Sequence, residues 1–134
     1  MLQFSQIYIP ICAYVTMTKS TLAQEINQLH ANICSAISEP NRILLLYAID
    51  EKDRNVNTLA DIVDISQSAA SRHLKVLKER GLILAKKEGP QVIYTLADDR
   101  IIKALNMLRE LMLDNLAQRA DLLNANQDLE KGNL

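Results

Sequence analysis

Residues 66–81 constrain the fold more than any other segment, because they encode one short amphipathic helix with both ends marked. Apolar side chains recur at helical spacing on one side, and hydroxyl, amide and cationic side chains occupy the other. Ser66 can cap the helix, and Gly81 can take the left-handed conformation that ends it. The residues predicted to be buried are Ala69, Leu74 and Leu77, with Ala70 and Val76 at the edge.

A second helix of similar length is predicted directly before this one. Asn57 or Thr58 can cap its start, and Asp61 stands where a capping box has its acid. Its apolar side consists of Leu59, Ala60, Ile62 and Val63. Only the turn at 64–66 separates the two helices, and this spacing is typical of a helix-turn-helix.

After Gly81 the pattern changes to two extended segments, 82–86 and 92–96. The residues between them, 87–91, contain a Gly-Pro pair that breaks any helix. A β-hairpin is therefore predicted beside the helix-turn-helix. The expected fold class is mainly α with a small β-hairpin, which is a winged helix-turn-helix.

The polar side of the helix at 66–81 has the chemistry of a surface that contacts DNA. Small residues at its start let the helix N-terminus approach a phosphate, and longer side chains can reach base edges in a major groove. The whole chain has a net charge of −1, but residues 72–87 contain six Lys or Arg and one Glu. The alternative is an ordinary solvated helix face. The predicted DNA-binding residues are Ser66, Gln67, Ser68, Ser71, Arg72, His73 and Lys75 on the helix, and Lys86, Lys87 and Gln91 on the hairpin.

Five segments in order resemble the ArsR/SmtB family of bacterial transcriptional repressors, and the similarity spans about residues 22–119. The resemblance implies a dimeric winged-helix repressor of the cytoplasm that leaves its operator DNA when an inducer binds. The segments are SEPNRILLL at 38–46, LADI at 59–62, SxSxxSxHLxxL at 66–77, GLI at 81–83 and YxL at 94–96.

Two outer segments, 21–37 and 99–119, each predict a helix with an apolar stripe. A small core cannot cover both stripes, so we expect them to pack against a second copy, and the resemblance implies the same pairing. The alternative is burial within one chain. A two-fold dimer would place its two recognition helices one DNA turn apart, about 34 to 36 Å, on a palindromic operator. The predicted interface residues are Leu22, Ile26, Leu29, Ile33, Leu105, Leu108, Met112 and Leu116.

No metal or other cofactor is expected, although the resemblance implies two places where relatives bind metals. At the first site, metal-binding relatives carry thiolate ligands where this chain has Asn55 and Asn57, which supply no thiolate. The second site corresponds to Asp98, Arg100, Leu111 and Asp114, where both imidazoles are missing. Asp98 is instead predicted to cap the last helix.

The chain has two cysteines, Cys12 and Cys34, and they do not identify the inducer. A thiol pair there could sense oxidants, persulfides or a thiophilic metalloid. The alternative for Cys34 is a small buried hydrophobe beside the helix stripe. A structural disulfide is not expected in a cytosolic DNA-binding protein.

The chain is expected to divide into an extension at 1–17, a winged-helix and dimerisation domain at 18–119, and a polar tail at 120–134 that frays. The extension carries no charge, so the basic start of a signal peptide is missing, and no membrane partner is expected.

No phosphate loop, nucleophile elbow or metal-binding His pair is present in the sequence, so we expect no enzymatic activity. The rival to a DNA-binding regulator is a winged helix that contacts an acidic protein surface and reads no DNA sequence.

Overall fold

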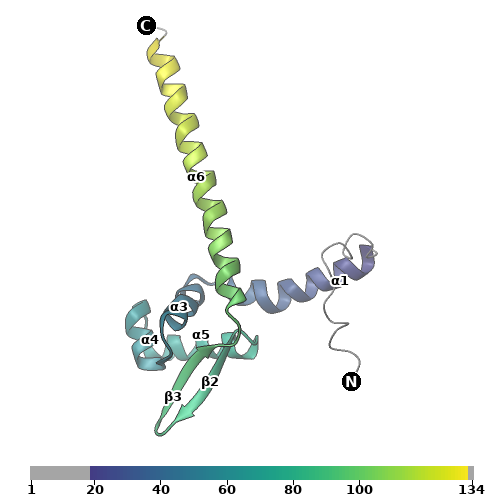
Figure 1. Cartoon of the computed structure of the whole chain (residues 1–134), viewed down its shortest axis with the longest axis vertical. Helices are drawn as coiled ribbons and strands as arrows, with labels where there is room; N and C mark the ends of the chain where they lie inside the picture. Colours follow the sequence, from purple (N-terminus) through teal and green to yellow (C-terminus); the bar gives the residue numbers. More distant parts are fainter. Residues whose placement is uncertain (1–18, 133–134) are drawn as a thin grey trace.

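Two helical arms extend from a small core of helices and strands (Figure 1). The computed structural model describes residues 19–132. The first arm is one helical stretch with a π-helical turn: α1 (Lys19–Leu29), the π-helix η3 (His30–Cys34) and α2 (Ser35–Ile37). The core comprises α3 (Pro40–Glu51), β1 (Arg54–Asn55), α4 (Val56–Val63), α5 (Gln67–Glu79), β2 (Ile83–Glu88) and β3 (Gln91–Leu96). The second arm is α6 (Arg100–Gly132).

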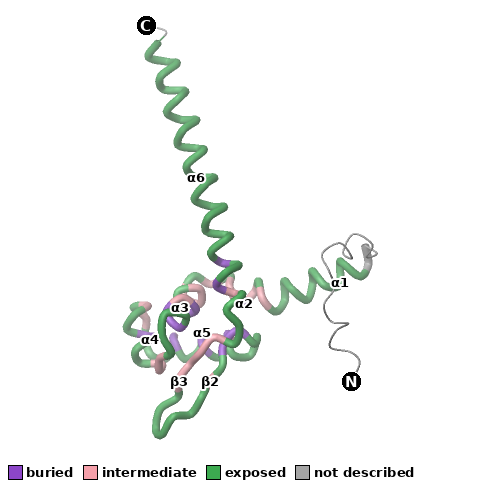
Figure 2. Tube along the Cα trace, viewed as in Figure 1, coloured by how far each residue is buried: buried purple, intermediate pink, exposed green. Residues whose placement is uncertain are grey.

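Leucine and isoleucine side chains from α3, α4, α5 and β2 meet in one hydrophobic core. Each such side chain contributes about 1.5–3 kcal/mol by leaving water. Ala36 from α2 and Ile102 and Leu105 from α6 join this core, so both arms are attached by their inner ends, and the rest of each arm is largely exposed (Figure 2). The largest fully buried side chains are Leu45, Leu46, Ile49, Leu59, Leu74, Leu77 and Ile83.

The two ends of α5 confirm the sequence prediction. The Ser66 hydroxyl accepts a hydrogen bond from the Ala69 backbone N–H at 3.1 Å. Gly81 has a φ of +76°, and its N–H and that of Leu82 bond back to Lys78 and Leu77, which is the Schellman arrangement. The buried side of α5 differs from the predicted one at one position. Ala70, predicted at the edge, is fully buried, whereas Ala69, predicted to be buried, is half-buried.

The start of α4 was predicted wrongly. Asn55, and not Asn57 or Thr58, is the N-cap, since its side chain accepts from the Thr58 N–H at 2.9 Å. The cause is a short strand that sequence reasoning missed: β1 pairs with β3, which keeps Asn55 extended, and the helix begins at the next residue. Asp61 consequently lies beyond the position of a capping-box acid.

The hairpin is confirmed, with a shorter loop than the sequence suggested. Only Gly89 and Pro90 connect the strands, and Gly89 has the positive φ of +62° that a two-residue hairpin loop favours at its first position. The sheet is antiparallel with strand order β1-β3-β2. Lys86 pairs with Ile93 and Lys87 with Val92, so the two lysines lie on opposite faces of the hairpin.

The last helix is longer than expected. The prediction that the tail from residue 120 frays is wrong as far as the structure describes it, because α6 continues without interruption to Gly132. Residues 120–131 contain Ala, Leu, Gln, Glu and Lys, which favour helices, and no Pro or Gly. No helix within residues 19–132 combines the length and apolar character that a membrane span requires.

Candidate nucleic-acid interface

The outer side of α5 presents polar side chains that are exposed to solvent. Gln67, Ser68, Ser71, Arg72 and Lys75 all lie on this side. Within the described part of the chain, Gln67, Ser71 and Arg72 make no side-chain hydrogen bond or ion pair. Their donors and acceptors are therefore available to a binding partner.

Lys75 and Ser68 on α5 have only weak internal partners, and Ser66 is the N-cap of the helix. The Lys75 ammonium lies 3.9 Å from the Glu79 carboxylate, and both side chains are largely exposed. An exposed pair of this kind contributes little to stability, so Lys75 can exchange it for a phosphate. The Ser66 and Ser68 hydroxyls lie 3.2 Å apart at the helix start, beside the free backbone N–H groups of the first turn.

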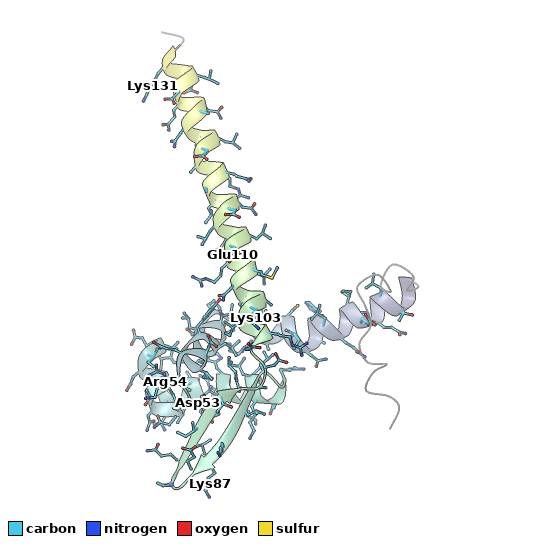
Figure 3. All side chains as sticks on the ribbon, in the orientation of Figure 1. Asp53, Arg54, Lys87, Lys103, Glu110 and Lys131 are labelled. Atoms are coloured by element: carbon cyan, nitrogen blue, oxygen red, sulfur yellow. The ribbon has the colours of Figure 1, made fainter. Side chains whose placement is uncertain are left out.

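The hairpin supplies further cations. Lys86 and Lys87 are exposed, and Lys87 lies near the tip of the hairpin (Figure 3). Gln91 is also exposed, but its Oε1 accepts from Asn55 Nδ2 at 3.3 Å. Gln91 therefore connects the hairpin to the start of α4 as well as facing solvent.

His73 differs from the other predicted DNA contacts. It is half-buried, and its Nδ1 lies 3.5 Å from Nη1 of Arg42 on α3. The same guanidinium donates to the backbone carbonyls of Ala36 and, at 3.0 Å, Ser35. The structure thus places His73 on the inward side of α5, where it packs toward α3 and away from the exposed polar side chains.

Sequence reasoning missed Arg42, Asn32 and Arg80. Arg80, just after α5, donates to Asn32 Oδ1 on the π-helix at 3.2 Å. Together with Arg42, it joins the first arm to the recognition helix. No local pattern could reveal these pairs, because the partners are 31 and 48 residues apart in the chain.

Most of the predicted dimer-contact residues are exposed on the two arms. Leu22, Ile26 and Leu29 on the first arm are 43–51% exposed, although they are large and apolar. Leu105 is the exception, because it is only 5% exposed and belongs to the core of its own chain. The remaining predicted contacts are Leu108, Met112 and Leu116, all exposed on α6, and Ile33, which is partly buried.

An apolar groove of about 550 Å³ lies between the first arm and the inner half of α6. Its walls include Leu29, Ile33, Ile101, Leu108 and Leu111. Cys34 also lines this groove as a free thiol that is exposed in the single chain, so it is not buried within its own chain as the alternative prediction would have it. Cys12 lies outside the described residues.

The Asp98 side chain caps the first N–H of α6, as the sequence predicted, although Asp99 is the residue directly before the helix. Its Oδ1 accepts from the Arg100 backbone N–H at 2.9 Å, and its Oδ2 accepts from the Arg100 guanidinium at 2.7 Å. These hydrogen bonds to the charged form lower the pKa of Asp98 to about 2. Within residues 19–132, no three His, Cys, Asp or Glu side chains gather as a metal-ligand set.

Comparison with known proteins places these features in context. Residues 39–84 match the family model described as bacterial regulatory protein, arsR family. The nodulation protein NolR of Rhizobium meliloti is 30% identical over 88 residues, which cover 66% of this chain and 72% of NolR. The transcriptional repressor SmtB of Mycobacterium tuberculosis is 32% identical over 78 residues, and the match spans 58% of either chain. The crystal structure of Rv0081 from M. tuberculosis superposes with a TM-score of 0.65 at 29% identity, covering 71% of this chain and 96% of the other.

Proposed function

Because the chain belongs to the ArsR family of bacterial regulatory proteins, we propose that it binds a palindromic operator as a homodimer and represses transcription until an inducer releases it. It is a DNA-binding transcriptional regulator with a winged helix-turn-helix. The proposal goes beyond that function in five respects: the symmetry of the operator, dimerisation, repression, release by an inducer and a cytoplasmic location. The proposal also holds that the chain has no enzymatic activity.

The observation that carries the proposal is the unpaired polar side of α5. Gln67, Ser71 and Arg72 are exposed and have no side-chain partner in the described chain. In a major groove, Arg72 could donate to guanine and Gln67 could pair with adenine, and these are the contacts that distinguish bases. Ser66, Ser68 and the N-terminus of α5 would approach a phosphate.

The hairpin would contribute affinity rather than sequence preference. Lys86 and Lys87 lie on opposite faces of the two strands, so they would contact different phosphates as the hairpin follows the DNA backbone. Phosphate contacts fix the register of the protein on the duplex but do not discriminate between base pairs. The sequence preference would therefore come from α5.

The two arms support the dimer. Both present rows of large apolar side chains to solvent, and the free energy of removing such surfaces from water favours association. A two-fold dimer through these arms would hold two copies of α5 at a fixed separation. We expect light scattering to give the mass of two chains.

A gel-shift titration against the DNA upstream of its own gene tests DNA recognition. We expect tight binding to a palindrome that weakens steeply with salt, because Lys and Arg side chains release counterions from the phosphates. Equal affinity for every DNA sequence would favour the rival function, in which the basic surface binds an acidic protein.

Cys34 is a free thiol on the wall of an apolar groove, and it is the candidate residue for sensing an inducer. We infer that, if this protein senses oxidants, persulfides or a thiophilic metalloid, Cys34 takes part, with Cys12 as its partner. Cys34→Ser should then abolish the response in a reporter strain and leave repression intact. An unchanged response would exclude a thiol sensor at this position.

A further inference from the structure

We propose that Asn55 is a positioning residue for DNA binding, because its side chain holds Gln91 and so fixes the hairpin tip, residues 86–92, beside α4. Lys87 would then reach the DNA backbone from a hairpin that is already ordered. This inference rests on the proposed contact between Lys87 and phosphate and adds the device that places this lysine. It assigns Gln91 to the support of the hairpin and not to DNA.

The hairpin tip is not held by burial. All of its residues are exposed, and it projects away from the core (Figure 2). The third strand does not reach it either, because β1 pairs only with Ile93 and Tyr94 of β3. Two strands alone are only marginally stable in water. The place of the hairpin tip therefore depends on what else holds it.

One side-chain contact joins the hairpin tip to the start of α4. Asn55 Nδ2 donates to Gln91 Oε1 at 3.3 Å. Within the described chain, no other side-chain hydrogen bond or ion pair connects the hairpin tip to another element. The backbone of Asn55 pairs with Ile93, and Gln91 lies two residues away along β3, on the same face of the sheet. The Asn55 side chain therefore extends the connection made by β1 beyond its last paired residue.

The Asn55 amide is itself fixed in place by α4. Its Oδ1 accepts from the Thr58 backbone N–H at 2.9 Å, which makes Asn55 the N-cap. An amide has both an acceptor oxygen and donor N–H groups, so Asn55 can accept from α4 and donate to the hairpin at once. A serine would cap the helix about as well, but its side chain is one bond shorter and its oxygen would be committed to the cap. The amide therefore does more than the cap requires.

A groove lies beside this contact. Its volume is about 300 Å³, and it runs between the start of α4 and the hairpin, with Asn55 and Gln91 among its lining residues. Val56 and Val92 line it from the two elements. Because the groove separates the helix from the hairpin here, apolar packing does not join them, and the amide hydrogen bond makes the connection.

The connection bears on DNA binding through Lys87. Lys87 pairs with Val92, the neighbour of Gln91 in the chain, and lies near the end of the hairpin (Figure 3). Only a short turn separates α4 from α5, so a hairpin held against α4 is also placed relative to the recognition helix. A segment that is ordered before binding loses less conformational entropy when the complex forms. Release of the hairpin tip should therefore weaken the phosphate contact and leave base recognition by α5 unchanged.

Nuclear relaxation of backbone ¹⁵N in the full-length chain without DNA tests whether Asn55 holds the hairpin tip. Asn55→Ser keeps a capping oxygen and removes the donor, whereas Gln91→Met keeps the length and removes the acceptor, and neither changes the charge. We expect the order of residues 86–92 to fall equally in both variants and no further in the double variant, because both remove one bond. Asn57→Ser is the matched control, since Asn57 lines the same groove without a side-chain hydrogen bond in the described chain, and it should leave this order unchanged. Unchanged order in Asn55→Ser and Gln91→Met would refute the inference.

Fluorescence anisotropy with operator and scrambled duplexes tests the role in DNA binding. We expect Asn55→Ser and Gln91→Met each to lower the affinity for both duplexes alike, by about two- to tenfold, and the double variant to lose no more than either one. A loss in Gln91→Met alone, with the hairpin tip still ordered, would show that Gln91 contacts DNA directly and would overturn the inference. A disordered tip with unchanged affinity would refute the positioning role alone. A wild-type chain that binds no duplex would refute the proposed function and this role with it, while the relaxation data would still decide whether Asn55 holds the tip.

Discussion

Arg42 on α3 donates from Nη1 to Nδ1 of His73 on α5, across a distance of 3.5 Å. The same guanidinium binds the carbonyls of Ser35 and Ala36, at the inner end of the first arm. One side chain therefore fixes the recognition helix relative to the arm on which the proposed dimer depends.

Replacement of Arg42 should lower the stability of the fold. Arg42→Ala leaves the Ser35 and Ala36 carbonyls without their donor, so we expect the free energy of unfolding in urea to fall by about 1–3 kcal/mol. Arg42→Lys should rescue little, because an ammonium cannot reproduce the planar fork of the guanidinium. Full rescue by lysine would show that charge alone matters at this position.

Replacement of Arg72 or Gln67 should reduce the preference for the operator. Each side chain is exposed and unpaired on α5, so alanine should cost about 1 to 3 kcal/mol of discrimination against other DNA while the dimer stays intact. Competition binding with operator and scrambled duplexes measures this preference. Lys131→Ala, at the tip of α6, is the control and should leave it unchanged. Unaltered discrimination in both α5 variants would mean that another side of the helix faces the bases.

Replacement of Lys87 should lower the affinity for DNA without changing the preference for the operator. Because we assign Lys87 to phosphate, Lys87→Ala should weaken binding to all duplexes alike and reduce the slope of log affinity against log salt by about 1. Fluorescence anisotropy over a range of salt concentrations measures both quantities. A loss confined to the operator sequence would contradict this assignment.

The carboxyl of Asp98 should titrate with a pKa of about 2 in the folded chain, against an ordinary value of 3.8. Its stabilising contribution is therefore complete above about pH 4 and is lost as the pH falls toward 2. Arg100→Ala should raise this pKa toward the ordinary value, as measured by carboxyl ¹³C NMR. Lys103→Ala should raise it less, since Lys103 acts only through its more distant charge. An unchanged pKa in Arg100→Ala would show that the Arg100 side chain does not hold the carboxylate.

The sequence by itself determined the elements whose signals are local. Ser66 and Gly81 mark the ends of α5 because a cap and a left-handed residue act within one turn of the chain. The hairpin followed from a change of periodicity, and the cap at Asp98 from its place before the helix. Helix propensity also favours the full length of α6, whereas the polar, Asn-rich composition of its last residues favours fraying.

Only the tertiary structure decided the features that join distant residues. The pairing of β1 with β3 moved the cap of α4 to Asn55, and the packing of α6 on the core buried Leu105 in its own chain. Contact with Arg42 turned His73 inward. Each outcome depends on which side of an element meets another element far along the chain, and periodicity shows that a side is apolar without identifying what covers it.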